Sequence, residues 1–196
     1  MEKKAFILID FSNDLIADDG VLSCGLPAQA IESVACAYFE WFLARGNFVV
    51  VCNDSHEETK DGARDPYHPE TALFPRHNVQ GCWGAELYGK VKEKWTAIHE
   101  SHPFETVYFR KVRFSAFAGT RLDIWLRARD VTEVVLGGVC THICVLHTAI
   151  DAYNRGYQVT IADDATVSDS VENKAFAMDH MRNLLGARVV TLATLD

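Results

Sequence analysis

The sequence predicts an α/β protein of three layers (α/β/α), in which helices cover both faces of a six-stranded, mostly parallel sheet. Three observations support this fold class. Short apolar runs alternate with longer stretches of helical periodicity. The apolar runs are nearly continuous, which is typical of strands buried on both faces of a parallel sheet. The chain has 196 residues and no stretch that looks like a linker, so we expect one domain over 1–196.

The first half of the chain predicts two strands, a helix and a long loop. KAFILID (4–10) is expected to form a strand, and a helix is expected over 27–46, with Pro27 in its first turn and Gly46 at its end. NFVVVCN (47–53) is expected to form the second strand. The segment 54–84 is polar and rich in His, Pro and Gly. A loop of that length in a compact domain is usually functional.

The second half continues the alternation. We expect four strands and four helices: helix 85–99, strand 106–111, helix 121–129, strand 133–138, a helix from about residue 141, strand 158–163, helix 171–185 and strand 188–193. Strands that are each followed by a helix predict parallel pairing.

Composition and charge exclude several classes of partner. The formal net charge of −8 argues against a surface for nucleic acid or for an anionic membrane. No stretch approaches the roughly 20 apolar residues of a membrane span, and the N-terminus does not read as a secretory signal. We therefore expect a cytoplasmic protein. Its six cysteines are expected to be reduced, because a chain of this size needs no disulfide framework.

Polar residues follow several of the predicted strands. Ligands of open parallel sheets bind at the carboxyl ends of the strands. Asp10 ends the first strand, Asp54 and His56 follow the second, Lys111 ends the third, and the stretch from Cys140 to Cys144 follows the fourth. We expect all of these side chains at one edge of the sheet.

Three of these residues have the chemistry of a nucleophile with its base. Cys144 lies near the start of a predicted helix, where the macrodipole favours a thiolate. Lys111 would lower the pKa of this thiol further, and Asp10 could accept and donate the proton. Taken singly, each residue has a structural explanation: a buried thiol, an apolar lysine stem and a carboxylate that caps a turn. Their convergence on one edge favours the catalytic interpretation.

The long loop predicts a metal site. Asp54 and His56 stand two residues apart, so both side chains can point to the same side of an extended segment. His77 offers a second imidazole and Glu70 a second carboxylate. This ligand set suits Zn²⁺, Fe²⁺ or Mn²⁺. Loop histidines without any metal remain the alternative.

Four motifs together resemble one known family. LIDFSNDL, NDSHEE with HPETALFPRHNVQGCWGAEL, RKVRFSAFAGTRLD and GGVCTHICVLHTAIDAYNRGY follow in this order along the chain. They resemble the isochorismatase-like cysteine hydrolases and, within these, the bacterial nicotinamidases. The resemblance runs nearly end to end and implies the Rossmann-like fold of that family. The metal-ligand set favours nicotinamidase over isochorismatase.

The resemblance implies a reaction and the residues that perform it. Nicotinamide, and also pyrazinamide, would be hydrolysed to the acid and ammonia through a cysteine thioester, as a step of NAD salvage. Asp10, Lys111 and Cys144 would be catalytic. The backbone N–H groups of Cys140 and Cys144 would form the oxyanion hole, with a cis peptide between Val139 and Cys140.

Further expectations concern the metal, the pocket and the assembly. The resemblance assigns one divalent transition metal per chain, Zn²⁺ first and Fe²⁺ or Mn²⁺ as alternatives, which binds the ring nitrogen of the substrate. We also expect a homo-oligomer. The expected metal ligands are Asp54, His56, Glu70 and His77, and the expected pocket walls are Phe11, Leu15, Trp83 and Phe114.

Three other functions compete with this interpretation. The chain could hydrolyse a different amide or an N-carbamoyl compound, as other members of the superfamily do. It could be a non-catalytic binding or regulatory protein, because a fold does not imply a function. A redox role for Cys140 and Cys144 is the least favoured, since the chain has no C-x-x-C motif there.

Overall fold

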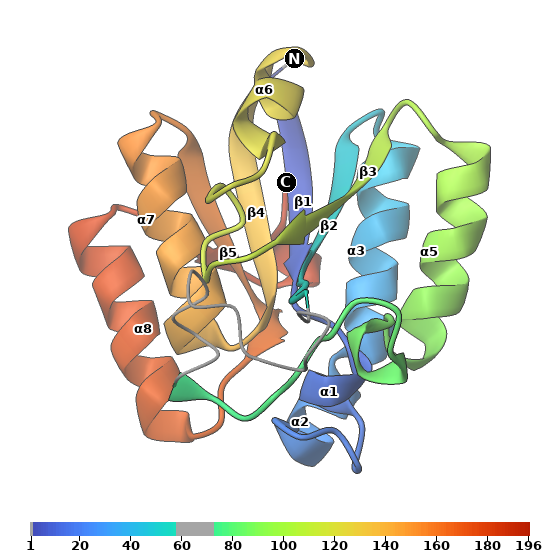
Figure 1. Cartoon of the computed structure of the whole chain (residues 1–196). Helices are drawn as coiled ribbons and strands as arrows, with labels where there is room; N and C mark the ends of the chain where they lie inside the picture. The colour runs from blue at the N-terminus through green and yellow to red at the C-terminus, as the bar shows by residue number, and fades with distance from the viewer. Residues whose placement is uncertain (1, 58–72) are drawn as a thin grey trace.

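The structure, a computed structural model, describes residues 2–57 and 73–196. A six-stranded sheet in the order β3-β2-β1-β4-β5-β6 forms its centre (Figure 1). All its neighbouring strands pair in parallel, which confirms the predicted fold class. The strands are β1 (Lys3–Ile9), β2 (Phe48–Asp54), β3 (Thr106–Lys111), β4 (Val131–Val139), β5 (Gln158–Val167) and β6 (Arg188–Val190).

Helices cover both faces of the sheet (Figure 1). On one face α3 and α5 pack against β1, β2 and β3, with α1 and α2 at the end of this layer, and on the other face lie α6, α7 and α8. The helices are α1 (Asn13–Ile16), α2 (Gly25–Ala30), α3 (Glu32–Ala44), α5 (Gly89–Ser101), α6 (Leu122–Arg127), α7 (Leu146–Asn154) and α8 (Val171–Leu184). Shorter helical turns are η1 (Trp83–Ala85), η2 (Thr141–Val145) and η3 (Leu192–Thr194).

The apolar runs of the strands supply both layers of the core. In β1, alternate side chains point to opposite faces: Phe6 stacks on Tyr38 of α3 at 4.7 Å between ring centroids, while Ile7 packs with Leu122 of α6. All four side chains are fully buried. Burial on both faces explains why these strands read as continuous apolar runs.

Several elements differ from the expected ones, among them the last strand, β6, which ends at Val190 rather than at 193. The helix expected over 27–46 is divided at Ile31 into α2 and α3. Both segments contact β5, but α2 otherwise packs against α1, whereas α3 packs against β1, β2 and α5. Strand β5 continues to Val167, four residues beyond the expected end. Helix α5 begins at Gly89 rather than at 85.

Within residues 2–57 and 73–196, no helix combines the length and the apolar character that crossing a bilayer requires.

Candidate active site

The functional residues lie where the central strands end. The chain winds from β1 through β2 to β3 on one side and places β4, β5 and β6 on the other. The carboxyl ends of β1, β2 and β4 therefore surround a topological switch point, the usual ligand site of such sheets. Asp54 and Lys111 are paired in register across β2 and β3. Asp10 follows directly after β1, and Cys140 after β4.

Lys111 is the centre of a buried cluster of charged and reactive groups. Its Nζ lies 2.7 Å from Asp10 Oδ2, 2.6 Å from Asp54 Oδ1 and 3.7 Å from Cys144 Sγ. Lys111 and Asp10 are fully buried, Asp54 is 6% exposed and Cys144 is 7% exposed. The predicted convergence of Asp10, Lys111 and Cys144 is therefore found. The pairing of Asp54 with Lys111 is an addition that the sequence did not predict.

Close backbone approach at the ends of β1 and β4 positions this cluster. Gly138 has φ +111°, and a Cβ at this position would lie 1.9 Å from the carbonyl oxygen of Ile9. Only glycine fits there. Asp10 itself has φ 56°, a conformation that Asp adopts more readily than most residues. Its Oδ1 accepts a hydrogen bond of 2.6 Å from the backbone N–H of Asp54, so the carboxylate is fixed from two sides.

The turn that carries Cys144 is held by threonine hydroxyls. The peptide between Val139 and Cys140 is cis, as the family resemblance implied. Thr166 of β5 donates to the carbonyl of Gly138 at 2.8 Å, and its hydroxyl lies 2.9 Å from that of Thr141. On the helical side, Thr148 donates to the carbonyl of Cys144 at 2.7 Å. These contacts fix the backbone on both sides of the thiol.

The electrostatics assign the resting protonation states. Burial raises the pKa of the Cys144 thiol well above its usual value, and the neighbouring Asp10 raises it further while Lys111 opposes this. Burial also raises the pKa of Asp10, to about 6, although Lys111 opposes the rise. Burial alone would lower the pKa of Lys111, but Asp10 and Asp54 raise it well above its usual value. At neutral pH the cluster therefore holds a Cys144 thiol beside an ionised Asp10.

The protonation of Cys144 corrects an expectation from the sequence. The position near a helix start and the proximity of Lys111 predicted a lowered pKa for this thiol. Its pKa is raised instead, because burial and nearby carboxylates outweigh the single ammonium group. The consequence is that the thiol needs a base at the moment of reaction, and Asp10 is placed to be that base.

Three side chains beside this cluster form a candidate metal site. Asp54, His56 and His77 each offer a ligand atom, and these atoms lie within 4.8 Å of one another. Asp54 Oδ2 is 4.0 Å from His56 Nε2 and 3.8 Å from His77 Nε2. The Nδ1 of His77 lies 2.7 Å from the carbonyl of Pro75. A proton on that nitrogen would donate to the carbonyl and leave the Nε2 lone pair facing the cluster, as in metal-bound histidines.

This donor set fits a transition-metal ion. Two imidazole nitrogens and one carboxylate oxygen are the ligands that Zn²⁺ takes in catalytic sites with open positions. Backbone pairing brings the two histidines together, since the N–H of His56 donates to the carbonyl of Asn78 at 3.0 Å. Glu70, the fourth expected ligand, lies outside the described residues.

A pocket of about 280 Å³ opens onto the cluster. Leu15 and Phe114, two of the four expected walls, line it. Its other lining residues are Asp10, Leu22, Ser23, Cys24, Asp54, Phe74, Val139, Cys140, Ile143, Cys144 and Asp169. The lining side chains are mostly apolar, and Asp10, Asp54 and Cys144 of the buried cluster are among them.

Phe11 and Trp83 do not line this pocket, contrary to expectation. Phe11 is fully buried and packs edge to face on Tyr88, 6.3 Å between centroids, in the core layer of α3 and α5. Trp83 is 49% exposed at the start of η1. The chain leaves β1 through Asp10 in a left-handed conformation, so the next side chain enters the core rather than the pocket.

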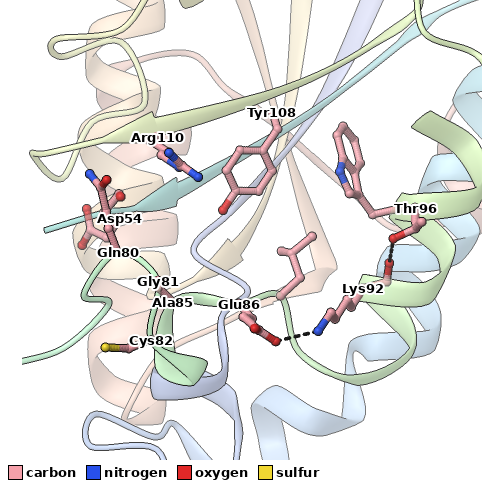
Figure 2. A pocket seen from close by; sticks show the side chains of 13 residues that line it. Asp54, Gln80, Gly81, Cys82, Ala85, Glu86, Lys92, Thr96, Tyr108 and Arg110 are labelled. Carbon is pink, nitrogen blue, oxygen red and sulfur yellow. Dashed lines mark hydrogen bonds and ion pairs between the residues drawn. The ribbon is translucent and has the colours of Figure 1, made fainter. Parts of the chain in front are cut away.

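A second, larger cavity of about 410 Å³ shares only Asp54 with this pocket (Figure 2). Tyr108 and Arg110 of β3 and Lys92 of α5 extend into it (Figure 2). Lys92 is paired with Glu86 at 2.5 Å. Neither Asp10 nor Cys144 lines this cavity, so cavity size does not mark the reactive site here.

Several residues that line the pocket were not predicted from the sequence. Cys24 precedes α2, Phe74 follows the segment that is not described, and Asp169 lies beyond the end of β5. None of them ends one of the strands β1 to β4. None belongs to a motif whose spacing indicates a catalytic or metal-binding site. No signal in a single sequence could have placed them beside Cys144.

A parallel α/β sheet whose carboxyl edge holds a buried thiol, carboxylate and ammonium group defines the class of a hydrolase with a cysteine centre. Comparison with known proteins identifies the family. The isochorismatase domain model matches residues 4–194. The chain belongs to the isochorismatase family.

Solved structures of relatives agree with the fold over nearly the full length. The nicotinamidase/pyrazinamidase PncA from Bacillus subtilis is 44% identical, with a TM-score of 0.89, over 96% of this chain and 99% of its own. The pyrazinamidase/nicotinamidase from Streptococcus mutans is 45% identical, with a TM-score of 0.89, over 96% of this chain and 100% of its own. A pyrazinamidase of Pyrococcus horikoshii in complex with zinc is 26% identical, with a TM-score of 0.78, over 97% of this chain and 99% of its own.

Proposed function

We propose that this chain is a nicotinamidase, an amidohydrolase that converts nicotinamide to nicotinate and ammonia in NAD salvage and also accepts pyrazinamide. One observation carries the proposal: Cys144, Asp10 and Lys111 form a buried cluster, of which Cys144 and Asp10 line a mostly apolar pocket, beside the candidate metal ligands. The relatives named as nicotinamidases and pyrazinamidases support the choice of substrate.

The pocket suits a small, neutral, flat substrate. Its volume of about 280 Å³ is at the lower end of small-molecule sites. Phe74, Phe114 and Leu15 supply apolar surface for a single aromatic ring. Among the described lining residues there are three carboxylates and no lysine or arginine, so a dianionic substrate would be repelled. A neutral carboxamide meets no such penalty.

The first half of the reaction breaks the C–N bond. Asp10 takes the proton of the Cys144 thiol, and the thiolate attacks the carboxamide carbon. The backbone N–H groups of Cys140 and Cys144 stabilise the oxyanion. Asp10 then gives its proton to the departing nitrogen, which leaves as ammonia, and a thioester remains on Cys144. Lys111 stays protonated and stabilises Asp10 in its ionised form.

The second half hydrolyses the thioester. Asp10, again ionised, accepts a proton from a water molecule that attacks the thioester carbon. The tetrahedral intermediate forms in the same oxyanion hole and collapses to nicotinic acid, which releases its proton to solvent and leaves as nicotinate. The proton held by Asp10 returns to the sulfur, so the cluster recovers its resting state.

A divalent transition metal completes the proposal, one ion per chain. Asp54, His56 and His77 would hold it, together with Glu70 from outside the described residues, and when bound it supplies a Lewis acid to which a ring nitrogen can bind. We propose zinc rather than Fe²⁺ or Mn²⁺, which the zinc complex of the pyrazinamidase supports. The proposal also includes a homo-oligomer, testable by light scattering of the purified chain.

Ammonia release from nicotinamide tests this function directly. The purified chain should release ammonia from nicotinamide and pyrazinamide much faster than from N-carbamoyl amino acids of similar size. The reverse order of rates would assign the chain to the N-carbamoyl hydrolases of the superfamily. No ammonia release from any of these compounds would favour a non-catalytic role.

A further inference from the structure

Two thiols other than Cys144 line the pocket, and they touch each other. The Sγ atoms of Cys24 and Cys140 lie 3.3 Å apart, although 116 residues separate them in the sequence. Both side chains are half-buried. Both belong to the wall of the pocket that holds Asp10 and Cys144. The pair is therefore part of the active-site surface, but neither of its thiols takes part in the mechanism above.

The surrounding backbone places the two sulfurs close to bonding distance. The N–H of Cys24 donates to the carbonyl of Leu15 at 2.9 Å, which fixes the segment before α2 against α1. The carbonyl of Cys140 accepts from Ile143 at 3.1 Å and from Val145 at 3.3 Å. The sulfurs must approach by a little over 1 Å to reach the roughly 2.05 Å of a disulfide. Gly25, directly after Cys24, has φ +66°, and a Cβ at this position would meet only Pro27 Cδ, at 3.9 Å, so this side of the backbone is not closely packed.

The pKa of Cys24 is shifted in the opposite direction to those of Cys36, Cys52, Cys140 and Cys144. The hydrogen bond from Cys140 lowers the pKa of Cys24, despite partial burial. The same contact and burial raise the pKa of Cys140. Burial raises the pKa of Cys36 to about 11, and that of Cys52 and Cys144 as well. Because the thiolate is the reacting form, Cys24 is better suited to attack an oxidant than Cys36, Cys52, Cys140 or Cys144.

We propose that Cys24 and Cys140 form a reactive dithiol that low-molecular-weight disulfides oxidise to an intramolecular disulfide. In the first step the Cys24 thiolate attacks one sulfur of the small disulfide RSSR. A bond from Cys24 to SR forms, the S–S bond of RSSR breaks, and one RS⁻ leaves. In the second step Cys140 loses its proton and attacks the Cys24 sulfur, which releases the second RS⁻. Two protein thiols are oxidised, and RSSR is reduced to two RSH.

The disulfide would slow hydrolysis reversibly. It draws the segment before α2 across the pocket towards Cys140 and so narrows the space for a substrate. It also moves Cys140, whose backbone N–H is assigned to the oxyanion hole. This consequence depends on the proposed function, whereas the formation of the disulfide does not.

Peptide mapping tests the disulfide without any activity measurement. The mapping uses the full-length Cys144→Ala variant, in which Cys140 is the only thiol of the tryptic peptide 130–155. Further cleavage after glutamate separates Cys24 from Cys36 at Glu32 and shortens the second peptide to 134–155. After incubation with oxidised glutathione, a cross-link should join peptide 5–32 to peptide 134–155, and dithiothreitol should remove it. If both thiols instead stay free or carry only glutathione, the proposal is wrong.

Ammonia release tests the consequence for the site. We expect oxidised glutathione to reduce the rate of the wild type by about five-fold or more, with full recovery in dithiothreitol. The Cys24→Ser variant, measured against its own reduced rate, should lose less than about two-fold, while Cys36→Ser should respond as the wild type does. Equal losses in wild type and Cys24→Ser would show that oxidation of another thiol slows the reaction, and would overturn the proposal. If the reduced protein released no ammonia at all, the proposed function would be wrong. Peptide mapping would still show whether Cys24 and Cys140 form a disulfide.

Discussion

Lys111 balances the charge of the reactive centre at the scale of single residues. It is the only cation within bonding distance of both Asp10 and Asp54 among the described residues. Without it, two buried carboxylates would face each other, and one of them would have to take up a proton. The ionised state of Asp10 at neutral pH therefore depends on this one ammonium group.

Replacing Lys111 should leave Asp10 protonated at neutral pH, so that Asp10 can no longer act as the base. In Lys111→Met the pKa of Asp10 should rise further, so kcat for nicotinamide should fall by at least about 100-fold. Steady-state kinetics measure this, and circular dichroism confirms that the variant is folded. Lys94→Met, which removes an exposed ion pair with Glu40, is the matched control and should stay within about two-fold. If Lys111→Met kept more than about a third of the wild-type kcat, Lys111 would have no essential role in the reaction.

The residues of the reactive cluster could be predicted from the sequence because each ends a strand or follows one closely. Asp10, Asp54, Lys111 and Cys144 were predicted in this way and lie together. The protonation of Cys144 was predicted in the wrong direction, because it depends on how deeply the thiol is buried, and burial of one side chain is a tertiary property. The same limit explains why Cys24 was not recognised as a partner of Cys140.

At the scale of elements, the end of β2 and the segment around Val79 hold the candidate metal ligands. Asp54 is the last residue of β2, and an isolated parallel bridge pairs His56 with Val79. This bridge brings His77 beside His56, 4.7 Å between ring centroids. The ligand geometry therefore depends on backbone pairing between segments that are distant in sequence.

Removing the metal should affect substrate binding more than the chemical step. Metal analysis of the purified chain should find about one transition ion per chain. A chelator should raise KM for nicotinamide by about 10-fold or more, and His77→Ala should lose the ion. His99→Ala, on α5 outside the candidate metal cluster, is the control and should retain it. A metal-free preparation with an unchanged KM would refute this role.

The crossing of β1 and β4 is the second element on which the site depends. Gly138→Ala would bring a Cβ to within 1.9 Å of the carbonyl oxygen of Ile9. We expect a loss of more than about 3 kcal/mol of unfolding free energy, together with loss of activity. Gly156 also has a positive φ, but a Cβ at this position would meet no other atom within 4 Å, so Gly156→Ala should cost only about 1 kcal/mol. Urea denaturation measures the unfolding free energy of both variants. Equal losses would show that β4 at Gly138 is not tightly packed against Ile9 of β1.

At the scale of the whole molecule, a buried ion pair connects strands across the sheet. Glu133 of β4 is 2% exposed and accepts hydrogen bonds of 2.7 Å from Thr160 of β5 and from Arg188 of β6. Lys4 of β1 lies 3.3 Å from its other oxygen. Burial alone would raise the pKa of Glu133, but these partners hold it below its usual value.

This network should make stability depend on pH. Because the folded-state pKa of Glu133 lies below the unfolded value of about 4.3, its contribution is complete above that value and is lost as the pH falls through the folded pKa. Glu133→Gln should therefore destabilise the chain by about 1–3 kcal/mol near pH 7 and by much less near pH 3. Chemical denaturation at both pH values measures the difference. An equal loss at both would mean that the charge of Glu133 contributes nothing.

The fold class followed from the sequence because its signal is distributed over the whole chain. Six apolar runs specify a sheet buried on both faces, and the error of a few residues at the end of β5 or the start of α5 does not change the topology. The division between α2 and α3 at Ile31 was missed, since nothing in the local pattern shows that the two segments pack against different neighbours.

In the proposed reaction, Cys144 forms a thioester with the acyl group of the substrate. Acid quenching during turnover of nicotinamide, followed by peptide mass spectrometry, tests it most directly. In the wild type we expect a nicotinoyl group on Cys144 within peptide 130–155. In Cys144→Ala we expect neither an adduct nor ammonia release. Cys140→Ser, which keeps its backbone N–H, should still form the adduct. Ammonia release by Cys144→Ala at a rate near that of the wild type, or an adduct on any other residue, would contradict the account.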